Sequence, residues 1–144
     1  MPSHHPAILV PIYQPRLSPI EEFSLDVSVQ SLAGRRIDFI GPSDLALDYY
    51  SRRYPQLGFI GMAPQCFASI ADYNRLLLDP AFYERFAAQG HVLILQTDAV
   101  VLRDEALRRL AALNDEFHAI VRSAAASARL VSMLGAVIAL PLVM

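Results

Sequence analysis

The chain has 144 residues, enough for one domain with a hydrophobic core and too few for two domains of ordinary size. Hydrophobic residues make up 54% of the chain and charged residues 18%, which excludes an intrinsically disordered protein. The formal net charge is −2 and no basic stretch is longer than a pair of arginines, so we expect no nucleic-acid partner. A single cysteine, Cys66, excludes an internal disulfide and favours a reducing, cytoplasmic location.

The first helix is predicted from its ends. Ser18, Pro19 and Glu21 have the form of a capping box, in which a serine cap and a glutamate three residues later satisfy each other's backbone N–H groups. The helix should continue to about residue 30 or 32 and end before Gly34. The apolar side chains predicted to face the core are Ile20, Phe23, Val27 and Leu32.

Short apolar runs alternate with further helix signals along the chain. The runs that predict strands are residues 7–12, 37–40, 57–62 and the apolar part of 91–105. The segments that predict helices after the first are 43–53, 70–78, 80–88 and 104–113. Strands that alternate with helices at this spacing favour an α/β domain with a largely parallel sheet.

The segment 91–105, HVLILQTDAVVLRDE, holds the strand of greatest functional interest. Its run of Val, Leu and Ile is typical of a strand buried on both faces. The first polar side chains after it, Gln96, Thr97 and Asp98, emerge at the carboxyl end of the strand, where open α/β sheets bind ligands. Asp98 is therefore a candidate ligand-binding residue, and the alternative is a residue that only shapes a turn or caps a helix.

The C-terminal segment, residues 130–144, is apolar enough for a membrane but shorter than the ~20 residues that a spanning helix needs. A buried or loosely packed helix and a membrane-associated segment are both open interpretations. The composition changes near Asn114, and aromatic residues stop after Phe117. We therefore separate residues 1–113 from an Ala- and Val-rich tail, residues 114–144.

Residues 67–104 contain a helix bearing Tyr-x-Arg at Tyr73 and Arg75, then a short helix, then the apolar strand that ends at Asp98. This order resembles the nucleotide-sugar half of GT-A-type glycosyltransferases, where a helix carrying an arginine precedes a strand ending in Asp-x-Asp. Including VPIYQPRLSPIEEFSL at residues 10–25, the chain is similar over residues 7–113 to a glycosyltransferase-like family of unknown function, domain of unknown function 5672.

We expect the tail, to which the resemblance does not extend, to form an apolar helix. The resemblance implies a partial GT-A or Rossmann-like sheet, largely parallel and flanked by helices. It also implies that Asp98 binds a divalent metal and the nucleotide sugar. Gln96 replaces the first acid of the tripeptide, so it keeps a hydrogen-bonding group but loses a charge. Mn²⁺ or Mg²⁺ would then have one protein carboxylate, Asp98, as its ligand.

The resemblance assigns three further binding residues. Arg75 would compensate the charge of the diphosphate, because a guanidinium can grip phosphate in a bidentate way. Pro11 and Tyr13, at the carboxyl end of the first strand, match the segment that cradles the base. The alternatives are an ion pair of Arg75 with a neighbouring aspartate, simple packing of Tyr13, and a strand hydrogen bond for Gln96.

The expected function is that of a glycosyltransferase-like protein which binds a nucleoside-diphosphate sugar through residues 1–113. The tail at 114–144 differs from the aromatic-rich continuation of the family, so we expect a truncated or frame-altered member with weak or no transfer activity. No catalytic residue is assigned. The alternative is a non-catalytic remnant or interaction domain that touches a membrane through residues 130–144.

Overall fold

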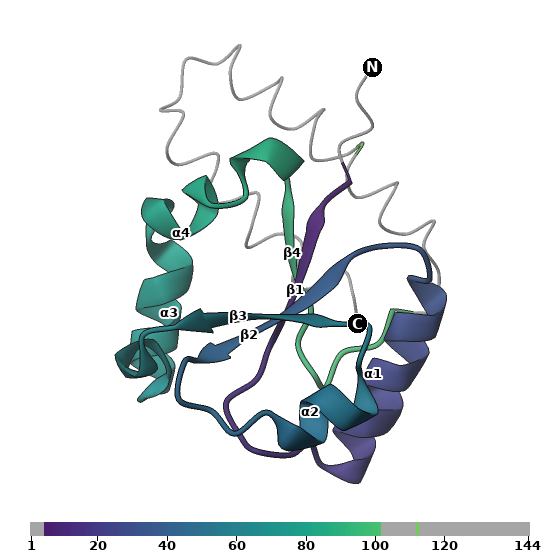
Figure 1. Ribbon diagram of the computed structural model, residues 1–144. Helices are drawn as coiled ribbons and strands as arrows, with labels where there is room; N and C mark the ends of the chain where they lie inside the picture. Colours follow the sequence, from purple (N-terminus) through teal and green to yellow (C-terminus); the bar gives the residue numbers. More distant parts are fainter. Residues whose placement is uncertain (1–4, 102–111, 113–144) are drawn as a thin grey trace.

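Strand β1 (Ala7–Pro11) lies inside a four-stranded sheet whose strands are all parallel (Figure 1). The computed structural model describes residues 5–101 and residue 112. The sheet is completed by β2 (Ile37–Pro42), β3 (Gly58–Met62) and β4 (Val92–Ile94), in the order β3-β2-β1-β4. The predicted α/β domain with a parallel sheet is therefore confirmed for the described residues.

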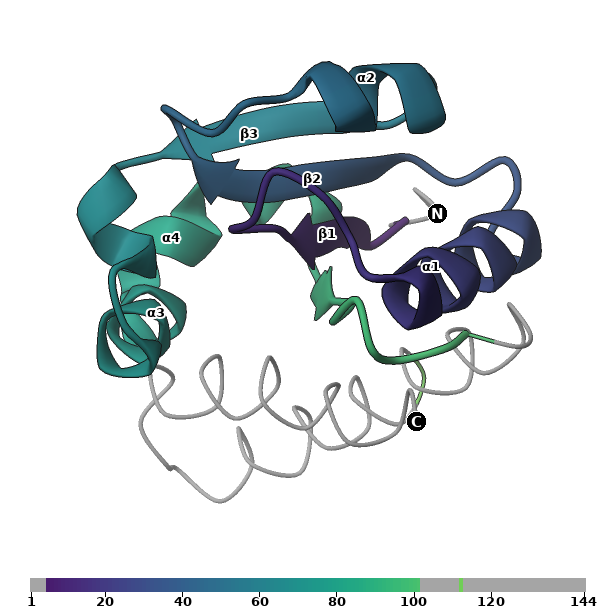
Figure 2. The same cartoon turned by 90° about the horizontal axis from the view of Figure 1, so that it is seen from below.

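The helices cover both faces of the sheet. On one side lie α1 (Pro19–Ser31), which joins β1 to β2, and α2 (Asp48–Arg53), which joins β2 to β3 (Figure 2). The connection from β3 to β4 crosses the other side and consists of η1 (Pro64–Phe67), α3 (Ile70–Leu78), α4 (Pro80–Glu84) and η2 (Ala87–Gln89).

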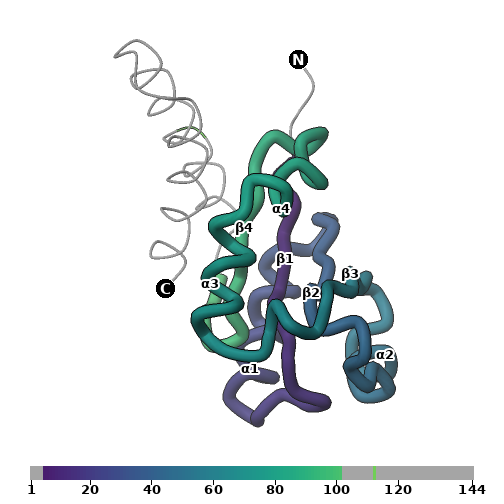
Figure 3. Tube along the Cα trace, turned by 90° about the vertical axis from the view of Figure 1, so that its left-hand side faces the viewer, coloured from purple at the N-terminus to yellow at the C-terminus, as the bar shows by residue number. Residues whose placement is uncertain are grey.

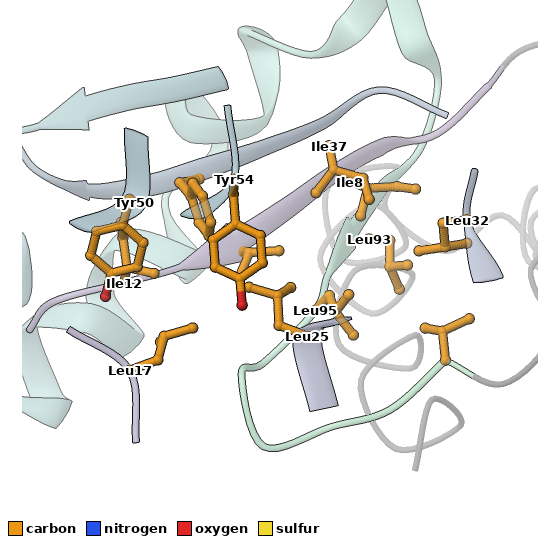
Figure 4. Close-up of a cluster of buried hydrophobic side chains, with 13 residues drawn as sticks. Ile8, Ile12, Leu17, Leu25, Leu32, Ile37, Tyr50, Tyr54, Leu93 and Leu95 are labelled. Carbon is orange, nitrogen blue, oxygen red and sulfur yellow. The ribbon is translucent and has the colours of Figure 1, made fainter. Parts of the chain in front are cut away.

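Strand β1 contributes to two hydrophobic clusters, one on each face. Ile8 and Val10 pack with the cluster beneath α1 and α2, which Figure 4 shows with Leu25 and Tyr50 among its members. Leu9 points to the opposite cluster, which includes Phe82 of α4. Side chains that alternate between two covered faces explain why the strand is a continuous apolar run.

The predicted ends of α1 are confirmed. The backbone N–H of Glu21 donates to Ser18 Oγ at 3.3 Å, and the backbone N–H of Ser18 donates to Glu21 Oε2 at 2.8 Å. After the last turn, Gly34 has a φ of +86°, a conformation that glycine adopts without steric cost. These local signals define where the helix begins and where the chain leaves it.

The predicted buried face of α1 is wrong at two positions. Ile20 is 72% exposed and Phe23 is 67% exposed, although Leu32 is buried as expected. The face that packs on the domain instead contains Ser24, Leu25 and Ser28. Small serine side chains allow a close approach there, and Ser28 Oγ accepts a hydrogen bond from the backbone N–H of Val101 at 2.9 Å.

Helix α2 begins later than predicted, at Asp48 instead of residue 43 or 44. The reason lies in the backbone after β2. The N–H of Ser43 donates to Met62 O at 2.8 Å, and the N–H of Leu45 donates to Pro42 O at 3.0 Å. These bonds hold the chain in a turn at the carboxyl end of β2, so Ser43 does not cap a helix.

The third and fourth predicted strands and the helix 70–78 are confirmed, with small changes at their ends. The helix predicted at 80–88 is divided into α4 and η2. The helix predicted at 104–113 and the tail at 114–144 lie outside the described residues, residue 112 apart. In the part of the chain that the structure describes, no helix is long and apolar enough to cross a membrane.

The two-sided burial of β1 leads to a stability prediction. Leu9→Ala should lower the free energy of unfolding by about 2–5 kcal/mol, because Leu9 is 0% exposed and its removal leaves a cavity. The control is Ile70→Ala, which should change the free energy of unfolding by less than about 0.5 kcal/mol because Ile70 is 82% exposed. Urea denaturation of the full chain measures both, and equal losses would contradict the assignment of Leu9 to the core.

Candidate functional site

The order of the strands reverses between β1 and β4. From β1 the chain moves through α1 to β2 and then to β3, and it later returns across the other face to place β4 on the free side of β1. Figure 3 shows β1 and β4 running side by side, as their parallel pairing requires. In open parallel sheets, the crevice at the carboxyl ends of such a strand pair is the usual ligand site.

The segment Gln96 to Asp98 lies at this carboxyl edge. The N–H of Leu95 donates to Leu9 O at 2.8 Å, so the pairing with β1 extends past β4 and brings Gln96 to the level of Pro11. The N–H of Ala99 then donates to Gln96 O at 3.0 Å and closes a turn. The predicted residues Pro11 and Gln96 thus meet at neighbouring strand ends.

The exposed members of the predicted site are Tyr13 and Asp98. Tyr13 follows β1 and is 62% exposed, whereas Pro11 is buried. Asp98 is exposed, and no hydrogen bond or ion pair joins its carboxylate to another of the described residues. An aromatic ring and an unpaired carboxylate are therefore open to solvent at the ends of β1 and β4.

Side chains on both sides of the sheet hold the turn at 96–98. Thr97 Oγ1 donates to Glu21 Oε1 of α1 at 2.6 Å. Gln96 Nε2 donates to the hydroxyl of Tyr73, on α3, at 3.4 Å. The turn is therefore connected to helices from both layers, and no local sequence pattern indicated the contact between Thr97 and Glu21.

These contacts favour the ionised form of Glu21. The hydroxyl of Thr97 is the main cause that lowers the pKa of Glu21 below its usual 4.5, and the backbone N–H of Ser18 adds to this effect. Burial opposes the shift without cancelling it. A carboxylate that accepts several hydrogen bonds is stabilised in its ionised form.

Tyr73 stays neutral beside Gln96. Burial raises the pKa of Tyr73 to about 12, while the hydrogen bond from Gln96 acts in the opposite direction. The ring also lies near Phe67, with centroids 5.9 Å apart. A neutral, partly buried phenol gives the Gln96 amide a fixed partner and so orients it at the edge of the sheet.

The loop between β1 and α1 is held by two tyrosines of α2. Tyr50 donates its hydroxyl proton to Gln14 O at 2.8 Å, and burial raises the pKa of Tyr50 to about 12. The ring of Tyr49 lies 5.4 Å from Cζ of Arg16, and its hydroxyl donates to Glu22. The sequence offered no spacing signal for these contacts, since they join side chains of different elements.

Arg75 takes the arrangement that was the alternative to phosphate binding. Its guanidinium lies 2.9 Å from Asp72 Oδ1, and its side chain is 78% exposed. Asp72 also accepts a hydrogen bond from Ser69 Oγ at 2.6 Å, so it belongs to the capped first turn of α3. In this geometry Arg75 is part of a helix-surface ion pair, and a contact with phosphate stays a prediction.

The described residues do not form a metal centre by themselves. No group of three or more His, Cys, Asp or Glu among them is arranged to hold a metal ion. Asp98 is exposed, while Glu21 is engaged by Thr97 and Ser18. Hard divalent cations require several oxygen ligands, so Mn²⁺ or Mg²⁺ would depend on oxygens of a bound ligand.

Comparison with known proteins gives one match. A family described as "Protein of unknown function (DUF5672)" matches residues 56–120. This segment includes β3, α3, α4, β4 and the turn at 96–98, but neither β1 nor α1. No curated protein and no solved structure matches the chain. The resemblance to a family of unknown function is thus confirmed for residues 56–120, and its nucleotide-sugar part stays a prediction.

The contact between α1 and the turn predicts a titration. Replacing Thr97 by Val should raise the pKa of Glu21 toward 4.5, because the largest cause of its lowered value is removed. Thr97→Ser keeps a hydroxyl and should leave this pKa low. NMR titration of the Glu21 carboxyl carbon in the full chain measures both variants.

The sign of the accompanying stability change follows from the direction of the pKa shift. Because the pKa of Glu21 is lower in the folded chain, its contribution to stability is present above about pH 4.5 and is lost as the pH falls through the folded value. Thr97→Val should therefore be less stable than Thr97→Ser at pH 7, with a smaller difference in acid. A Glu21 pKa that is equal in both variants would contradict the contact.

Proposed function

We propose that this chain binds a nucleoside-diphosphate sugar at the carboxyl ends of β1 and β4. The observation that carries the proposal is the turn at 96–98, which α1 and α3 hold at the reversal of the strand order with the Asp98 carboxylate exposed. The family match includes this turn, although the family description names no activity. The expected similarity to GT-A-type enzymes supports the choice of ligand.

Each residue of the site has a role in the proposal. Tyr13 offers an exposed ring on which a nucleobase can stack, next to the buried Pro11. The amide of Gln96 and the carboxylate of Asp98 can accept hydrogen bonds from the hydroxyls of ribose or sugar. Arg75 would have to leave Asp72 to reach a phosphate, which makes it the weakest member of the set.

The proposal covers binding and assigns no transfer step. Asp98 is the one unpaired carboxylate that the described residues place at the turn, so no metal-dependent step and no catalytic base is derived from them. A bound divalent cation would compensate the charge of the diphosphate, with Asp98 as its protein ligand.

A second candidate is a non-catalytic interaction domain. It is favoured by the two large apolar side chains that α1 exposes, Ile20 and Phe23. Such a domain would not depend on the carboxylate of Asp98. The two functions can therefore be separated by removing that charge alone.

Binding of a UDP- or GDP-sugar to the full chain, followed by NMR or calorimetry with and without Mn²⁺, tests the proposal. Asp98→Asn should weaken binding by about tenfold or more, because a charge-assisted hydrogen bond to the ligand becomes a neutral one. Glu84→Gln removes the same charge from the exposed end of α4, toward the amino ends of the strands, and should bind like the unaltered chain (Figure 1).

Two results would count against the proposal. Absence of saturable binding at millimolar ligand, with and without Mn²⁺, would reject nucleotide-sugar binding and leave the interaction domain. Equal affinities for Asp98→Asn and Glu84→Gln would show that the ligand binds elsewhere on the chain.

A further inference from the structure

We propose that Arg16, in the loop between β1 and α1, is the residue that contacts the phosphates of the ligand. The inference rests on the proposed function, because it places the diphosphate at the same edge of the sheet. It assigns to Arg16 the part that the resemblance gave to Arg75.

The position of Arg16 is fixed by its neighbours. It belongs to the loop that follows β1, at the same edge as Tyr13. The hydrogen bond from Tyr50 to Gln14 O ties this loop to α2. The guanidinium carbon of Arg16 lies 5.4 Å from the centre of the Tyr49 ring, which orients the group by a cation–π interaction.

The guanidinium of Arg16 is available for a ligand. Among the described residues, no carboxylate and no other acceptor pairs with it. Arginines elsewhere in the described chain are engaged with protein atoms, as the pairs of Arg36 with Asp38, Arg53 with Asp26 and Arg75 with Asp72 show. A guanidinium held only by a ring keeps its N–H donors free for a bidentate contact with phosphate.

The carboxylate that contacts the same tyrosine is engaged by the hydroxyl of that tyrosine. Glu22 lies in the first turn of α1, and its side chain accepts the hydroxyl proton of Tyr49. Tyr49 thus engages Glu22 with its hydroxyl and supports Arg16 with its ring. This division leaves the guanidinium as the unpaired positive group of the loop.

A phosphate at this edge needs such a cation, because the start of α1 is unfavourable for anions. Its first turn carries Glu21 and Glu22, and the N–H of Glu21 is already bound by Ser18 Oγ. A helix N-terminus attracts phosphate through free N–H groups and a positive potential, and here both are reduced. The charge that balances the phosphates must therefore come from a side chain, and the β1–α1 loop supplies it in Arg16.

The experiment compares Arg16→Gln, Arg75→Gln and the control Arg52→Gln in the full chain. Arg52 donates to Asp48 O within α2 and is exposed, so its replacement removes the same charge from a guanidinium that is already engaged by the protein. Each variant is titrated with a UDP-sugar, with uridine and with inorganic pyrophosphate, followed by NMR. Arg16→Gln should weaken the UDP-sugar and pyrophosphate by about tenfold or more and leave uridine unchanged, because only the phosphates contact Arg16.

The possible outcomes separate this inference from the proposed function. If the unaltered chain binds the UDP-sugar and Arg16→Gln binds it equally well, Arg16 is not the phosphate contact and the proposed function stands. If the chain binds pyrophosphate through Arg16 but no nucleotide sugar, the anion site is supported and the proposed function fails. Equal weakening by Arg52→Gln would show a general charge effect and overturn the inference, as would a chain that binds neither compound.

Discussion

The arrangement of the site depends on the carboxylate of Glu21. One of its oxygens accepts the backbone N–H of Ser18 and completes the start of α1, while the other accepts the hydroxyl proton of Thr97. The same side chain thus caps a helix and holds the turn that follows β4. Because Thr97 lies between Gln96 and Asp98, the position of both candidate ligand-binding residues is tied to the first turn of α1.

The next residue of the helix, Glu22, extends this connection to α2, which lies on the same side of the sheet. Glu22 accepts the hydroxyl proton of Tyr49, so the start of α1 joins the turn at 96–98 to the tyrosines of α2. These contacts lie next to β1, whose side chains are buried on both faces and whose backbone pairs with β2 and β4. The carboxyl edge of the sheet is therefore held by the hydrophobic packing of β1 and by the adjacent carboxylates of Glu21 and Glu22.

The sequence was informative where the interactions are local. The capping box at Ser18 and Glu21 uses residues three apart, and the apolar run before Gln96 needs only its own composition to indicate a buried strand. The contact of Thr97 with Glu21 joins residues 76 positions apart, so no local pattern could reveal it. The prediction that Ile20 and Phe23 face the core was wrong for a related reason. Hydrophobicity alone predicted an apolar face, whereas the helix is oriented so that Ser28 contacts Val101.

The pairing of charged side chains explains why the sequence did not indicate which arginine is free to contact a phosphate. Arg75 lies in a recognisable motif, but the neighbouring Asp72 at helical spacing engages it. Arg16 lies in the stretch 10–25, to which the resemblance gave no phosphate-binding role, and its guanidinium is oriented by Tyr49, which belongs to another element. Which guanidinium is free is a property of the folded chain, since it depends on the pairing of Arg75 within α3 and on the contact of Arg16 with α2.

Gln96 adds no negative charge to an edge of the sheet that already carries several carboxylates. The edge already carries the carboxylates of Glu21, Glu22 and Asp98, and a further acid would raise the cost of bringing a diphosphate there. Gln96 instead donates its amide to Tyr73 and adds no charge. A neutral residue at 96 and a guanidinium at 16 that pairs with no described carboxylate both limit the negative charge of this edge, as the proposed contact of Arg16 with phosphate requires.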